Sequence, residues 1–151
     1  NNIILWKNPS GYFNDAKEQK VRGIELEGNF SFQKLSVQAN YTFTEKVKQE
    51  PLRLPKHAAN VGLTYAAAKA QWGAHFRYVG SRYDADFSTF PSTTQKLKEF
   101  GLVDVRVTLP NFIGNANVSL AVTNLFDVSY TEFIGYSVLG RNLNIGLQYA
   151  F

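Results

Sequence analysis

The stretch that decides the fold is Leu-Gly-Arg-Asn-Leu-Asn-Ile-Gly-Leu-Gln-Tyr-Ala-Phe, residues 139–151. Its odd-numbered residues are mostly large and apolar, and they end with Leu147, Tyr149 and Phe151. Its even-numbered residues, such as Asn144 and Gly146, are small or polar. A helix would mix the two sets on its surface, whereas a β-strand places them on opposite faces. The stretch therefore predicts a strand with one apolar face and one polar face.

The same alternation recurs upstream, after a short apolar segment at Ile3–Trp6. The other strand candidates are Gly23–Phe32, Leu35–Thr44, Ala59–Ala66, Trp72–Tyr78, Val103–Leu109 and Ala116–Thr123. Together with 139–151 they predict eight antiparallel strands and no helix. With their flanking residues several run for about 11–14 residues, against about 5–6 in globular proteins. A tilted membrane-spanning strand needs about 9–11 residues, so these lengths favour a strand that crosses a bilayer.

The connections between these candidates alternate in length. Short turns are predicted near 32–34, 67–70 and 110–114, and long connections at 7–20, 45–54, 84–96 and 126–137. Up-and-down barrels of the outer membrane have tight periplasmic turns and long outer loops. A Greek-key sandwich has no reason to sort its connections in this way. The alternation therefore predicts an up-and-down transmembrane β-barrel segment.

Composition removes several classes of function. The chain has 151 residues, of which 44% are hydrophobic and 15% aromatic. It has no cysteine for disulfides or thiolate metal sites, and only two separated histidines, so no cofactor is expected. The net charge is +4, but the basic residues are scattered, which argues against nucleic acid as a partner. No secretory signal opens the sequence, and 1–6 resembles the middle of a strand, which favours a fragment of a larger protein.

The side chains at the predicted strand ends fit a membrane. Arg22, Arg82 and Arg141 share the apolar parity at the outer end, where a guanidinium can pair with lipopolysaccharide phosphates. The simpler interpretation is that these arginines reach from strand ends into water. At the opposite end an aromatic girdle is expected from Phe30, Phe32, Tyr65, Trp72, Tyr149 and Phe151.

Several motifs, taken together, resemble those of one family. Val122–Asp127 with Tyr130 is similar to the Asn-Leu-Phe-Asp…Tyr motif before the last outer loop of TonB-dependent receptors. The stretch 140–151 is similar to the last strand of that family, with its terminal aromatic residue. Segments 22–27, 55–57 and 78–84 also resemble family segments. Each motif alone is weak, but their common order makes the resemblance fairly specific over nearly the whole chain.

The resemblance implies a role for the whole chain, 1–151. Family members have an N-terminal plug and a barrel of about 22 strands, so this chain would be the last eight strands, without plug or TonB box. The implied function is uptake of a scarce nutrient across the bacterial outer membrane, of the iron-siderophore, haem or cobalamin type. TonB would supply energy indirectly, through the plug. The implied partners are lipid, lipopolysaccharide, the plug, the upstream strands, a small-molecule or metal-chelate ligand, and the barrel-assembly machinery, with Phe151 as its signal.

Two sets of residues are then candidates for function. Those expected on outer loops, facing a ligand, are Tyr83, Asp84, Asp86, Phe87, Tyr130, Phe133 and Tyr136. Those expected inside the barrel, facing the plug or a polar ligand path, are Glu25, Glu27, His75, Arg77, Asp104 and Arg106. The simpler interpretation of the second set is a wet lumen whose charges pair across strands, at about 0.2–1 kcal/mol for each pair.

Three other interpretations remain open at this point. A complete eight-stranded adhesin or membrane anchor is geometrically possible, although the many small residues on the polar face would leave it underfilled. An outer-membrane enzyme would need a nucleophile and a positioned histidine, and His57 has no Ser or Asp at a convincing spacing. A soluble ligand-binding barrel would turn the apolar face inward. Alternation alone does not say which face is inside, and detergent dependence would separate these classes.

Overall fold

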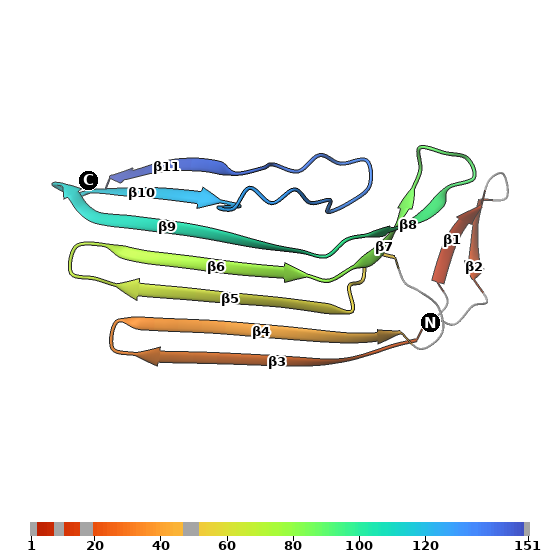
Figure 1. Ribbon diagram of the computed structural model, residues 1–151, viewed down its shortest axis with the longest axis horizontal. Helices are drawn as coiled ribbons and strands as arrows, with labels where there is room; N and C mark the ends of the chain where they lie inside the picture. The colour runs from red at the N-terminus through yellow and green to blue at the C-terminus, as the bar shows by residue number, and fades with distance from the viewer. Residues whose placement is uncertain (1–2, 8–10, 16–19, 47–51, 150–151) are drawn as a thin grey trace.

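The computed structural model describes residues 3–7, 11–15, 20–46 and 52–149, which form eleven strands and no helix within those ranges (Figure 1). The first two strands form a separate hairpin, β1 (Ile3–Lys7) with β2 (Gly11–Asp15). The seven that form the main sheet are β3 (Val21–Phe32), β4 (Leu35–Lys46), β5 (His57–Ala66), β6 (Gln71–Val79), β9 (Phe100–Ile113), β10 (Ala116–Thr123) and β11 (Asn142–Tyr149). The described residues contain no helix that could span a membrane.

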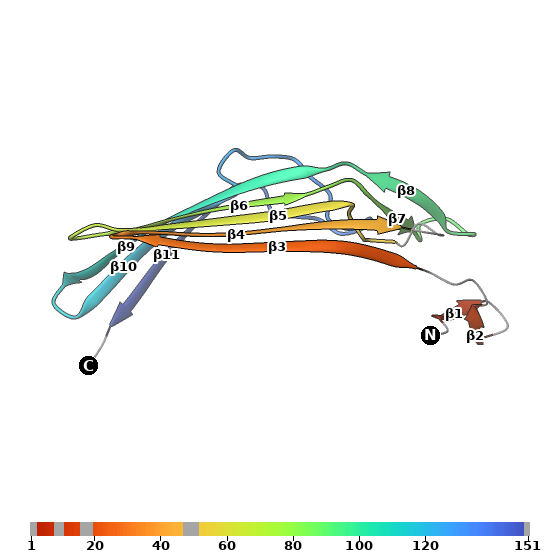
Figure 2. The ribbon, with the colours of Figure 1, turned by 90° about the horizontal axis from the view of Figure 1, so that it is seen from below.

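The main sheet is an antiparallel meander in the order β11-β10-β9-β6-β5-β4-β3. Long strands form because β-branched and aromatic residues alternate with small polar ones, a pattern that suits a pleated surface. Figure 2 shows that β9, β10 and β11 turn away from the plane of β3–β6, so the sheet is twisted and curved. The all-β antiparallel architecture predicted from the alternation is therefore confirmed.

Two details differ from the prediction. Ile3–Trp6 does not join the main sheet among the described residues, because β1 pairs along its length with β2. The connection predicted at 84–96 contains a hairpin of its own, β7 (Arg82–Asp86) with β8 (Thr93–Leu97), beyond the ends of β6 and β9 (Figure 1). Phe151 lies outside the described residues.

The connections sort onto two ends of the sheet, as the sequence predicts. Two-residue turns join β3 to β4 and β9 to β10, and residues 67–70 join β5 to β6, all at one end (Figure 1). Gly114 adopts a φ of 58° in its turn, a conformation that glycine reaches without steric cost. At the other end are residues 52–56, the β7–β8 hairpin, and residues 124–141, which we call the last outer loop.

One face of the sheet is apolar and uncovered among the described residues. Ile24 is 60% exposed, Trp72 54% and Ile145 73%, although all three are large hydrophobic side chains. The aromatic residues at the turn end, Phe30, Phe32, Tyr65, Trp72 and Tyr149, are exposed as well. Exposed apolar surface on this scale marks a contact with a membrane or another protein. The described part of the chain is therefore no two-layer soluble sandwich.

The sheet is open, since β3 and β11 form its two edges and do not pair with each other. A closed eight-stranded barrel thus finds no support in the described strands. The few buried apolar residues lie toward the outer end of the sheet, beside the long loops: Ala85, Leu97, Phe100 and Leu102. The packed part of the molecule is consequently the region where the loops meet the sheet.

Gly80 shows how closely the backbone packs at that junction. Its N–H donates to the carbonyl of His57 at 2.8 Å, and a Cβ at Gly80 would lie 2.8 Å from that oxygen. We expect Gly80→Ala to lower the free energy of unfolding by about 1–3 kcal/mol, because overpacking forces the backbone apart. Chemical denaturation measures the loss. Gly28→Ala is the control, since its Cβ would meet nothing within 4 Å; equal effects of the two substitutions would contradict this account.

Candidate functional site

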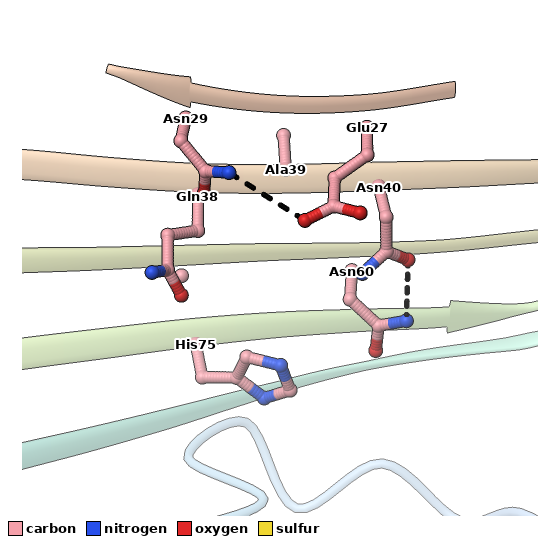
Figure 3. A pocket seen from close by; sticks show the side chains of 8 residues that line it. Glu27, Asn29, Gln38, Ala39, Asn40, Asn60 and His75 are labelled. Atoms are coloured by element: carbon pink, nitrogen blue, oxygen red, sulfur yellow. Dashed lines mark hydrogen bonds between the residues drawn. The ribbon is translucent and has the colours of Figure 1, made fainter.

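The polar face of the sheet carries a shallow hollow of about 270 Å³. Cross-strand register sets its residues side by side, with Asn29 opposite Gln38, and Gly62 opposite His75. Figure 3 shows the polar side chains that line it, which are Glu27, Asn29, Gln38, Asn40, Asn60 and His75. The Asn60 amide donates to the Asn40 side-chain oxygen at 3.0 Å. This surface offers both donors and acceptors, and it suits water or a polar chain segment.

The six charged residues predicted to face the lumen all lie on this polar face in the cross-strand register. Glu25 stands opposite Thr42, His75 opposite Asp104, and Arg106 opposite both Gly73 and Ala121. Glu27 lines the hollow, and Arg77 is paired with Glu132 of the last outer loop at 3.0 Å. Their proposed contact with a plug or a polar ligand stays a prediction.

The base of the last outer loop is shaped by two residues of the Asn-Leu-Phe-Asp stretch. Asn124 is 4% exposed and has a φ of 51°. Its side-chain oxygen accepts the Val128 N–H at 2.9 Å, and its own N–H donates to Asp104 at 2.8 Å. Asp127 accepts the N–H of Arg141 at 2.8 Å. These bonds close the loop on itself and fix its first residues to β9.

At the outer end of the sheet, residues from three outer segments and from two strands of the main sheet meet in a compact group that we call the outer-loop cluster. It comprises Arg53, Arg77, Arg82, Asp84, Phe100 and Glu132, from residues 52–56, β6, β7, β9 and the last outer loop. The guanidinium carbons of Arg77 and Arg82 lie 5.4 and 5.5 Å from the centre of the Phe100 ring, within cation–π range. Phe100 is 5% exposed, so its ring is largely shielded from water.

Asp84 is fully buried within this cluster, with 0% exposure. Its carboxylate accepts hydrogen bonds from Arg53 Nε at 2.7 Å, Ile134 N–H at 2.9 Å and Ala85 N–H at 2.9 Å. Burial on its own would raise the pKa of Asp84, but these three donors hold it below its usual value. The carboxylate is therefore charged at neutral pH. The structure places Asp84 inside the cluster rather than on its surface, and contact of Asp84 with a ligand stays a prediction.

Arg82 is also buried, with 4% exposure; its contact with lipopolysaccharide stays a prediction. Its Nη2 donates to the backbone carbonyls of Thr131 at 3.2 Å and Glu132 at 2.6 Å. Gly80 and Ser81 lie outside the strands, so the alternation of β6 does not carry through to Arg82. Burial lowers the pKa of Arg82, while Glu132 and Asp84 oppose that shift, and a guanidinium stays protonated at neutral pH.

The other predicted loop residues separate into packed and exposed side chains. Tyr130 packs on Phe100 with ring centres 4.6 Å apart, and Phe133 lies under the Arg53 guanidinium at 5.1 Å. Tyr83 is half-buried near Lys46, and Asp86 accepts bonds from Ser88 and Gln95 inside its own hairpin. Phe87 and Tyr136 are 75% and 72% exposed. These two are the most accessible of the set, and Phe133 is also 38% exposed.

Sequence reasoning missed three members of the cluster, Arg53, Phe100 and Glu132. They lie 31, 16 and 48 residues from Asp84 in the chain, and each is an ordinary residue in its own segment. Arg22 and Arg141 remain exposed, as the proposed contact with lipopolysaccharide requires.

Comparison with known proteins finds a matching family and solved structures with a similar architecture. Residues 1–125 match the family model described as TonB dependent receptor-like, beta-barrel. The siderophore receptor PiuA from Acinetobacter baumannii is 21% identical with a TM-score of 0.78, over 98% of this chain and 24% of that one. The pyoverdine outer membrane receptor FpvA from Pseudomonas aeruginosa, bound to pyoverdine, is 20% identical with a TM-score of 0.77, over 96% of this chain and 23% of that one. The Ferric-Catecholate import receptor Fiu from E. coli is 23% identical with a TM-score of 0.64, over 91% of this chain and 20% of that one.

The open, two-faced sheet thus has the fold of one segment of a β-barrel wall. The chain belongs to the TonB-dependent receptor family, and the family resemblance seen in its motifs is confirmed. It spans about a quarter of the length of the solved structures it matches, so its strands are one part of a barrel wall. The matched proteins are receptors and transporters rather than enzymes.

Proposed function

We propose that this chain is the C-terminal part of the barrel wall of an outer-membrane receptor for a scarce nutrient, namely a ferric siderophore. The observation that carries the proposal is the two-faced sheet. An uncovered apolar face suits hydrocarbon, and the opposite face carries polar groups with a loop folded over it. The names of the similar structures, receptors for siderophores and pyoverdine, favour an iron chelate over haem or cobalamin.

The proposal gives each surface a partner. The open edges of β3 and β11 pair with strands of the same barrel, and the hollow on the polar face meets the plug, through which TonB supplies energy. Arg22 and Arg141 contact lipopolysaccharide phosphates, and Phe151 is read by the barrel-assembly machinery. Three experiments test these contacts. A cross-linker placed at residue 75 tests contact with the plug, and absence of a cross-link removes that partner. Arg22→Glu tests retention of lipopolysaccharide, deletion of Phe151 tests membrane assembly, and an unchanged result in either variant removes the corresponding partner.

Uptake by cells tests the function itself. Cells that lack the intact receptor are complemented with its gene, starved of iron and given a panel of ferric siderophores, haem and cobalamin, each with a radioactive metal. We expect accumulation of at least one ferric siderophore, abolished when TonB is deleted. Accumulation of haem or cobalamin alone would transfer the proposal to that ligand. No uptake of any compound would contradict it.

A further inference from the structure

The outer-loop cluster joins segments that are far apart in the chain. Asp84 of β7 bonds Arg53, 31 residues before it, and the N–H of Ile134, 50 residues after it. The backbone adds a further link, since the Arg53 N–H donates to the carbonyl of Tyr83 at 2.7 Å. A single side chain, Asp84, thus connects residues 52–56, the β7–β8 hairpin and the last outer loop.

The links differ in how accessible they are to water. Arg82 and Asp84 are 4% and 0% exposed, whereas the side chains of Arg77 and Glu132 are 34% and 32% exposed. An exposed ion pair is screened by solvent and contributes little. Removing one partner of a buried pair leaves an uncompensated charge, which is strongly unfavourable. The bonds of Arg82 and Asp84 are therefore the ones that resist opening of the last outer loop.

The anchored part of the loop is short and well defined. Arg82 holds the carbonyls of Thr131 and Glu132, and Asp84 holds the N–H of Ile134. Backbone carbonyls and a backbone N–H of this loop, all within residues 131–134, are thus bonded to side chains of β7. The same stretch lies over the polar face, because Glu132 reaches Arg77 of β6. Beyond the anchor, Tyr136 and Leu139 are 72% and 73% exposed.

We propose that Arg82 and Asp84 are positioning residues that hold 131–134 of the last outer loop over the polar face as a fixed wall. This stretch does not open as a lid during transport. The consequence for transport rests on the function proposed above, whereas the anchoring does not. Arg82 Nη1 is buried without a hydrogen-bond partner among the described residues, so the guanidinium keeps donor capacity beyond its two carbonyl bonds.

Hydrogen exchange tests the anchoring in the whole receptor, folded in lipid vesicles. The amide of Ile134 is expected to exchange slowly in the unmodified protein, like strand amides. Asp84→Asn is expected to speed that exchange at least about tenfold, because local opening controls exchange. Arg53→Gln, which removes one of the three donors from a half-exposed position, is expected to have a smaller effect in the same direction. Asp86→Asn is the matched control, since the bonds that Asp86 accepts from Ser88 and Gln95 stay within its own hairpin.

The fixed wall is tested by cross-linking. Cysteines replace Arg77 and Glu132, a bifunctional thiol reagent joins them, and siderophore uptake is compared with the unlinked double variant. We expect equal uptake, and loss of uptake on cross-linking would overturn the fixed wall. The anchoring would be overturned if the Ile134 amide exchanges fast in the unmodified receptor, or if its exchange rate does not rise in Asp84→Asn and Arg53→Gln. Absence of uptake in the unlinked and unmodified receptors alike would instead count against the proposed function and leave the exchange result standing.

Discussion

Val61→Arg is expected to destabilise the receptor in lipid vesicles by about 2–4 kcal/mol, the cost of an arginine at the bilayer midplane. Val61 lies in the middle of β5 on the apolar face, in register with Ala39 and Phe76, and is 37% exposed. If this face meets hydrocarbon, the guanidinium loses its hydration and finds no partner. Denaturant titration of the receptor in vesicles measures the change.

Gly62→Arg is the matched control for Val61→Arg. Gly62 is the next residue of the same strand, faces the polar hollow, and has open space where a Cβ would be added. The charge and the depth are nearly the same, so the difference between the two variants reports which face meets lipid. Equal losses of stability, or a larger loss for Gly62→Arg, would contradict the assignment of the faces.

The double variant Phe87→Ala/Tyr136→Ala is expected to weaken binding of the transported chelate by about thirtyfold or more. Exposed aromatic side chains that become buried on binding contribute about 2 kcal/mol or more at binding hot spots. These two are the most accessible of the predicted ligand-facing residues, at 75% and 72% exposure. Titration of the purified receptor with the chelate identified by uptake gives the dissociation constant.

Phe112→Ala serves as the control for the aromatic pair. Phe112 is 57% exposed and lies beside the turn between β9 and β10, at the opposite end of the sheet from the outer loops. The variant removes a comparable aromatic surface without touching the loops. Unchanged affinity in the double variant, or an equal loss in Phe112→Ala, would exclude Phe87 and Tyr136 as ligand contacts.

The sheet was predictable because its information is local. Each strand carries its own alternation, as at 139–151, and each short turn follows directly from the length of chain between two such runs. The hairpin of β7 and β8 was missed because residues 84–96 show no clean division into apolar and polar positions. The apolar run Ile3–Trp6 predicts a strand but does not show which strand pairs with it, and in the structure its partner is β2.

The candidate site was less predictable because its information is distant. Asp84 and Arg82 look like loop residues in the sequence, and their burial depends on Ile134 and on the carbonyls of residues 131 and 132. No spacing rule connects positions about 50 residues apart across two loops. The common face of the six charged strand residues was easier to predict, since the parity of a strand fixes the side of every residue on it.

The central claim is that the apolar side of each strand lies against hydrocarbon, and lipid-phase quenching tests it most directly. The chain has no cysteine, so single cysteines at positions 58–65 of β5 can each carry a fluorophore in the receptor reconstituted with brominated lipids. We expect strong quenching at Ala59, Val61, Leu63 and Tyr65, and little at Ala58, Asn60, Gly62 and Thr64, in step with the alternation of a strand. Quenching at the second set, or at neither, would contradict the account.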